Sequence, residues 1–276
     1  MGRRFLILGA HPDDCDLLFG GSAILLGKAG NTVKFVSFTN GNAGHQSMTS
    51  EALAARRKKE TAEAAVKAGL FEYQVLDHND GWLTPSLENR AELIRIIREF
   101  NPDLVLCHRT CDYHPDHRAV GQLMEDASTM VGVPLCVPDA PIPENLSPLF
   151  GYVCDDFTEP APFVPEAAVI IDSAVDRKIE MLACQTSQFF EWLPYSRGIR
   201  DFDAAKMSRQ EQLEHIRSGW LSRDRARANR YREFLSACYG EAGKKAEYAE
   251  FFALMPVRGP KATEQLRELL ALPGNK

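Results

Sequence analysis

The stretch RFLILGAHPDD, from Arg4 to Asp14, decides how this chain is expected to fold. It begins with an apolar run, which is typical of a strand buried on both faces of a parallel sheet. The run ends in a turn that carries an imidazole, His11, and two adjacent carboxylates, Asp13 and Asp14. So many coordinating side chains directly after a buried strand indicate either an acidic helix cap or a site that holds a ligand.

Short apolar runs alternate with amphipathic segments over the first half of the chain. The pattern predicts strands at 4–9, 33–38, 73–76 and 103–108, and helices at 20–30, 50–68, 86–100 and 118–130. Ser50 and Ser86 are the expected N-caps of the second and third of these helices. This alternation predicts an α/β, Rossmann-like three-layer fold, with a mostly parallel twisted sheet and helices on both faces.

We expect residues 1–276 to form a single domain with three parts. Residues 1–130 form the α/β core that carries the site. Residues 131–200 contain a Pro-rich excursion with a hairpin-like strand at 149–154, then a late strand at 168–172 and a helix at 176–190. Residues 201–276 are expected to form a charged, helical C-terminal subregion.

Composition narrows the class of protein. The chain has 276 residues, 45% of them hydrophobic and 25% charged, with a net charge of −6, values that are ordinary for a soluble globular protein. The sequence has no basic stripe, so a nucleic-acid partner is not expected. No apolar run is long enough to span a membrane. The seven cysteines form no C-x-x-C pair, which favours a cytoplasmic protein with reduced thiols. The short apolar run near the N-terminus is read as a strand and not as a signal peptide. The sequence leaves homo-oligomerisation open.

Two clusters of coordinating residues carry the chemistry: His-Pro-Asp-Asp at 11–14 and His-Pro-Asp-His at 114–117. Each follows a predicted strand, and the carboxyl ends of parallel strands meet at one edge of the sheet. Catalytic Zn²⁺ sites take three His, Asp or Glu ligands, and the same donors suit Fe²⁺, Mn²⁺ or Co²⁺. The two clusters therefore predict one metal site.

The clusters hold more groups than a metal needs. One of Asp13 and Asp14 can bind the metal while the other acts as a general base. One of His114 and His117 can bind the metal while the other donates to a substrate oxygen. The residues favour a hydrolytic centre in which a metal and a base activate water.

These motifs resemble those of the LmbE-like, or PIG-L, family of metal-dependent deacetylases that act on N-acetylglucosamine groups. The resemblance covers Arg4 to Val120 and includes AHPDD, Gly20-Gly21, TNG-x-x-G and HPDH-R. It implies that Asp13 is the general base, and that a protonated His114, oriented by Asp116, stabilises the oxyanion. It implies that the metal, usually Zn²⁺, is bound by His11, Asp14 and His117.

The resemblance also implies contacts with substrate. Arg57 matches a residue that holds sugar hydroxyls, and Asp80 matches an acid near the same sugar. His45, which follows the TNGNAG loop, is a further candidate for substrate binding. Two residues depart from the family pattern: Asp16 stands where a Glu is usual, and Gln185 where a His is common.

The predicted function is hydrolysis of an N-acetyl or other N-acyl group from an amino sugar, such as a conjugate of N-acetylglucosamine. Two alternatives remain: an amidase acting on a thiol–sugar conjugate or another small N-acyl substrate, and a metal-binding relative without catalysis. A nucleotide-binding module is disfavoured, because no G-x-G-x-x-G follows the first strand and two carboxylates would face the pyrophosphate.

Overall fold

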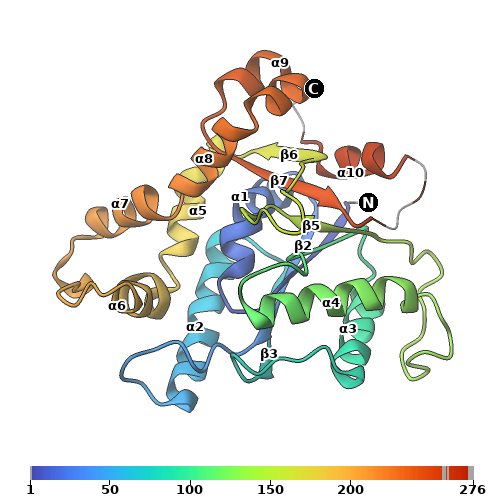
Figure 1. Ribbon diagram of the computed structural model, residues 1–276, viewed down its shortest axis with the longest axis horizontal. Coiled ribbons are helices and arrows are strands. Elements are labelled where there is room, and N and C mark those ends of the chain that lie inside the picture. The colour runs from blue at the N-terminus through green and yellow to red at the C-terminus, as the bar shows by residue number, and fades with distance from the viewer. Residues whose placement is uncertain (1, 257–258, 260, 273–276) are drawn as a thin grey trace.

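The computed structural model describes residues 2–256, 259 and 261–272, and a seven-stranded sheet forms the centre of this part (Figure 1). The strand order is β3-β2-β1-β4-β5-β7-β6, and only β7 runs antiparallel to its neighbours. The predicted α/β class with a mostly parallel sheet is therefore confirmed. The strands are β1 Arg4–Gly9, β2 Thr32–Thr39, β3 Glu72–His78, β4 Leu104–Cys107, β5 Leu149–Val153, β6 Ala167–Ile170 and β7 Ala249–Leu254.

Helices cover both faces of this sheet (Figure 1). Successive residues of β1 enter two different cores: Phe5 and Ile7 pack against α1, α2 and α5, whereas Leu6 and Leu8 pack against α3 and α4. This alternation explains why the strand is apolar at each position from Phe5 to Leu8. The helices are α1 Asp14–Lys28, α2 Ser50–Ala68, α3 Leu87–Phe100, α4 Pro115–Met130, α5 Val175–Leu182, α6 Leu193–Ser196, α7 Arg209–Gly219, α8 Ser222–Arg230, α9 Arg232–Lys245 and α10 Ala262–Leu270.

The strand order reverses at β1, and this reversal positions the site. The chain runs outward from β1 through β2 to β3, and then returns to place β4 on the other side of β1. A crevice forms beyond the carboxyl ends of two strands whose connections leave in opposite directions. The loops after β1 and β4, which carry the two clusters, therefore lie beside each other.

Two helices begin earlier than the sequence predicted. α1 begins at Asp14 instead of residue 20, and α4 begins at Pro115 instead of residue 118. Pro is well suited to the first turn of a helix, and His114 caps α4 by accepting a hydrogen bond from the backbone of Asp116. Each cluster therefore ends in the first turn of a helix, which fixes its side chains more firmly than a loop would.

Other predictions about the elements were wrong in detail. The N-cap of α2 is Thr49, not Ser50, because the Thr49 hydroxyl accepts from the Ala52 amide. The strand at 149–153 pairs with β4 in parallel instead of forming a hairpin. The predicted helix 176–190 is interrupted: α5 ends at Leu182, and a π-helical turn spans Ser187–Trp192.

The strand β7 was missed, because its segment was expected to be helical. β7 lies between β5 and β6, and its neighbouring residues Phe251 and Phe252 enter the cores on opposite faces of the sheet. Tertiary pairing, not local preference, makes this segment a strand. Among the described helices, none combines the length and apolar character that crossing a bilayer requires.

Candidate metal centre and active site

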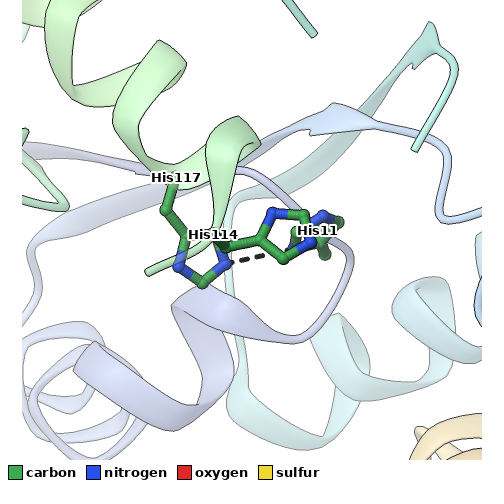
Figure 2. Close-up of side chains that lie close together, drawn as sticks. All are labelled: His11, His114 and His117. Atoms are coloured by element: carbon green, nitrogen blue, oxygen red, sulfur yellow. Dashed lines mark hydrogen bonds between the residues drawn. The ribbon is translucent and has the colours of Figure 1, made fainter. Parts of the chain in front are cut away.

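Side chains of the two clusters converge beyond β1 and β4, and Figure 2 shows His11 beside His114 and His117. His11 Nδ1 lies 3.2 Å from His117 Nε2 and 3.5 Å from Asp14 Oδ2, and the last two atoms are 3.4 Å apart. An ion with tetrahedral ligands at roughly 2.0–2.2 Å holds them about 3.3–3.6 Å apart. The spacing and chemistry of these three atoms therefore fit a divalent metal ion such as Zn²⁺.

The far side of each imidazole faces a carboxylate. His11 Nε2 lies 3.2 Å from Asp80 and 3.3 Å from Asp116, and His117 Nδ1 lies 3.1 Å from Asp112. Such carboxylates fix the orientation of metal-binding histidines and increase their basicity. Asp112 was not predicted as a site residue; its position five residues before His117 was the available signal.

Asp116 differs from its predicted role. Its carboxylate is fully buried, contacts His11, and accepts hydrogen bonds from the amides of Gly81 and Leu83 at 2.6 and 3.2 Å. Its link to His114 runs through its backbone amide, which donates to His114 Nδ1. The carboxylate thus orients His11 and anchors the loop that follows β3, and does not orient His114.

The electrostatics of the cluster favour a cation at its centre. Burial opposes charge on His11, but contacts with Asp116, Asp14 and Asp80 outweigh it and hold the pKa of His11 well above its ordinary value. Burial also opposes charge on His117, yet Asp14 and Asp112 raise its pKa to about 9. Burial would raise the pKa of Asp14, but the neighbouring histidines lower it well below its usual range. The carboxylates that favour the positive charge on these histidines would also favour a metal ion bound between them.

Asp13 lies next to the proposed ligand Asp14 but has a different partner. Its Oδ1 accepts a hydrogen bond from Arg57 Nη2 at 2.9 Å. Burial raises the pKa of Asp13, and the Arg57 guanidinium only partly opposes that effect. A carboxylate with a raised pKa beside a metal site suits a general base.

Arg57 is held in place by its own surroundings. It is 2% exposed and also lies against Gly41, where an added Cβ would be 2.6 Å from Arg57 Nη1. Gly41 has a φ of +69°, so both its backbone conformation and the nearby guanidinium disfavour any side chain there. The observed partner of Arg57 is the carboxylate of Asp13, so its predicted contact with sugar hydroxyls stays a prediction.

His114 stands at the N-cap of α4, with its ring edge-on to His11 at a centroid distance of 4.5 Å (Figure 2). Burial and the charges of His11 and His117 lower its pKa. Because Nδ1 accepts from the Asp116 amide, the neutral ring carries its proton on Nε2. The predicted role of a protonated His114 in stabilising an oxyanion stays a prediction.

His108, at the end of β4, was not among the predicted site residues. Its ring stacks on His117 with centroids 4.1 Å apart, and its Nε2 lies 3.3 Å from Asp14 Oδ2. It is buried and lines the same cavity as the three proposed ligands, and with Asp14 and His117 it forms a second group that could hold a metal ion. We assign it to packing that holds His117 in place.

A cavity of about 670 Å³ opens over the cluster. Asp13, His114, Arg57 and Asp80 all line it. His45 does not: its side chain is buried and its Nε2 lies 2.8 Å from Glu191. The Nδ1 atom of His45 accepts from the backbone of residues 47 and 48, so His45 supports its loop, and its predicted contact with substrate stays a prediction.

A buried cluster of candidate metal ligands with an adjacent carboxylate, at the switch point of an α/β sheet, is typical of metal-dependent hydrolases. A family model described as PIG-L, GlcNAc-PI de-N-acetylase, matches residues 6–128. The chain is 29% identical over 229 residues to the diacetylchitobiose deacetylase of Thermococcus kodakarensis. The matched region covers 78% of this chain and 82% of that protein. The N-terminal part of the chain, residues 6–128, is thus similar to the PIG-L, or LmbE-like, family.

Solved structures share the whole fold. The N,N'-diacetylchitobiose deacetylase of Pyrococcus horikoshii superposes with a TM-score of 0.70 at 24% identity, over 92% of this chain and 84% of that one. The 4-carboxy-2-hydroxymuconate hydratase GalB of Pseudomonas putida also has a TM-score of 0.70, at 18% identity, over 94% and 98% of the two chains. One fold thus carries different reactions, and the site must decide between them.

Proposed function

We propose that this protein removes the N-acetyl group of an amino sugar, such as a conjugate of N-acetylglucosamine, and releases acetate and a free amine. One observation carries the proposal: the ligand-spaced atoms of His11, Asp14 and His117 share a cavity with Asp13 and His114. The deacetylase activity of relatives supports the same reaction. We propose Zn²⁺ as the ion, with Fe²⁺ as the alternative.

Each residue of the site has a distinct task in this reaction. A bound divalent ion supplies Lewis acidity and lowers the pKa of water. Asp13 takes the proton of the attacking water and later passes it to the departing amine, so that the amide bond breaks without releasing an unstable amide anion. His114 donates from Nε2 to the carbonyl oxygen as negative charge develops there. Arg57 holds Asp13 in position, and Asp80 borders the sugar.

The wider assignment follows from the same features. We propose that the chain acts on a small amino-sugar substrate as a single domain, because a C-terminal strand, β7, completes the N-terminal sheet. The described cysteines are all free, which favours the cytoplasm. Two alternatives remain from the sequence: an amidase acting on other small N-acyl compounds, and a metal-binding protein without catalysis. One assay of acetate release distinguishes them from the proposed function.

That assay measures acetate released from a panel of N-acetylglucosamine conjugates, with Zn²⁺ or Fe²⁺ supplied. We expect D13N to lower kcat by about 10²–10⁴-fold, the range for loss of a general base, while binding the same amount of metal. Asp139→Asn is the control, since Asp139 is an exposed acid that pairs with Arg95 and does not line the cavity. A metal-loaded wild type that releases no acetate from any conjugate contradicts the proposal.

A further inference from the structure

The cavity over the metal centre has a second wall that contributes nothing to the ligand cluster. Trp220, Arg223 and Arg227 line it, the two arginines from α8 and the tryptophan from the turn before it. Their spacing of three and four residues places them on one side of this segment. Two guanidinium groups thus face the same cavity as the proposed catalytic residues.

Arg223 has no partner within the described part of the chain. No hydrogen bond or ion pair is formed by its guanidinium there, and its Nε is fully buried. Arg227, which is 5% exposed, also has a buried Nε without a partner, although its Nη2 donates to Asp156. A half-buried guanidinium without a counter-charge is unusual, because desolvation of the cation is then uncompensated.

The acids nearby are not free to neutralise Arg223, because each is already paired with another cation. The pairs are Asp155 with Arg109, Asp156 with Arg227 and Arg230, and Asp224 with Lys178. Burial and the charge of Arg227 lower the pKa of Arg223, which is the expected result of two cations close together. Asp155 and Asp156 also line this wall, and Asp224 and Asp156 partly offset the charge of Arg223, but no described carboxylate forms an ion pair with its guanidinium.

We infer that Arg223 and Arg227 form a subsite for an anionic group, a carboxylate or a phosphate, on the part of the substrate that extends beyond the N-acetylated sugar. This inference rests on the proposed function, since it specifies the substrate class of the same cavity. The guanidinium wall attracts such a group, so its charge also directs which end of the substrate faces that wall.

The test compares three substrates: neutral methyl N-acetylglucosaminide, its carboxymethyl analogue, and N-acetylglucosamine 1-phosphate. We expect wild type to prefer at least one acidic compound, and the faster of the two distinguishes carboxylate from phosphate. Arg223→Gln should lower the ratio of kcat/KM on that compound to kcat/KM on the methyl glycoside by about 10–100-fold, mainly through KM, as expected for loss of a charge-assisted hydrogen bond. Arg223→Lys should lose less of this preference.

Two further measurements separate binding from structure. Arg225→Gln is the control, because Arg225 is an exposed arginine of α8 that pairs with Glu247 and does not line the cavity; it should keep the wild-type ratio. The melting temperature of Arg223→Gln should equal or exceed that of wild type, since no described partner loses a contact. An unchanged ratio, or an equal loss on all three substrates, overturns the inference.

The inference can fail independently of the proposed function. If wild type hydrolyses the methyl glycoside with the same kcat/KM as both acidic compounds, deacetylation stands and the anionic subsite is overturned. If none of the three is hydrolysed, calorimetry of the carboxymethyl glycoside in the Asp13→Asn background still tests Arg223. Binding weakened tenfold or more by adding Arg223→Gln supports the subsite, and unchanged binding overturns it.

Discussion

Gln185 donates a hydrogen bond of 2.7 Å to the carboxylate of Asp16, across 169 residues of sequence. Both residues depart from the family pattern, and both are fully buried. The shorter acid on α1 and the amide that follows α5 therefore fit each other. Burial raises the pKa of Asp16 well above its ordinary value, and Gln185 is the main group that opposes this.

The pair predicts a non-additive effect on stability. Gln185→Leu leaves a buried carboxyl group without its donor and should lower the free energy of unfolding by about 1–3 kcal/mol. Adding Asp16→Leu should recover part of that loss, because replacing both polar partners is far less costly than replacing one. Urea denaturation measures both, with Gln210→Leu as an exposed control. Strictly additive losses would show that the two side chains do not interact.

The sequence predicted most of the sheet and both halves of the site, because these rest on local patterns. Apolar strands followed by coordinating residues are visible one segment at a time, and β1 and β4 carry them. Contacts between distant segments could not be predicted in this way. The pairing of β7, the contact between Asp116 and His11, and the partner of Arg57 all depend on how loops meet in space.

Arg57 is expected to act through Asp13. Arg57→Met should lower kcat on an N-acetylated amino sugar by about tenfold or more with a smaller change in KM, because the base loses its orientation. A role limited to sugar binding predicts the opposite split, with KM rising and kcat retained. Steady-state acetate release gives both constants. Arg118→Met is a suitable control, since that exposed arginine bonds only to backbone carbonyls of residues 112 and 113.

Metal binding should stabilise the fold through the same three side chains. Zn²⁺ at 100 times its dissociation constant should add about 2.7 kcal/mol to the free energy of unfolding, and a chelator should remove it. His117→Ala should abolish the effect, because it removes one of the three ligand atoms. His215→Ala, which alters a histidine packed between Phe190 and Phe202, should retain it. Equal stabilisation of both variants by Zn²⁺ in thermal melts would place the metal elsewhere.

Asp156 predicts part of the response to acid. Burial would raise its pKa, but hydrogen bonds from Arg227 and Arg230 lower it below its ordinary value. A depressed pKa stabilises the folded state above the unfolded value of about 3.9, and the stabilisation is lost as pH falls through the folded value. Wild type should therefore melt at a higher temperature than Asp156→Asn at pH 6, and the gap should close below pH 4. A constant gap would exclude titration of Asp156 as its cause.

Lys178 joins four elements from a position with no solvent exposure. Its Nζ lies 2.6 Å from Asp224 of α8, 2.7 Å from Glu250 of β7 and 2.9 Å from the carbonyl of Leu17 in α1. Lys178→Met leaves two carboxylates buried without their cation, and should lower the free energy of unfolding by about 3–5 kcal/mol.

The matched control for Lys178 is Lys206, whose side chain is 84% exposed and pairs with Asp203. Lys206→Met should cost less than about 1 kcal/mol, because water screens that pair. Chemical denaturation of both variants at neutral pH measures the difference. Because Glu250 also accepts from the amides of Gly21 and Ser22 in α1, loss of Lys178 should loosen the junction of β7 with α1 before the rest of the sheet. Hydrogen exchange that rises uniformly over the chain would contradict this local role.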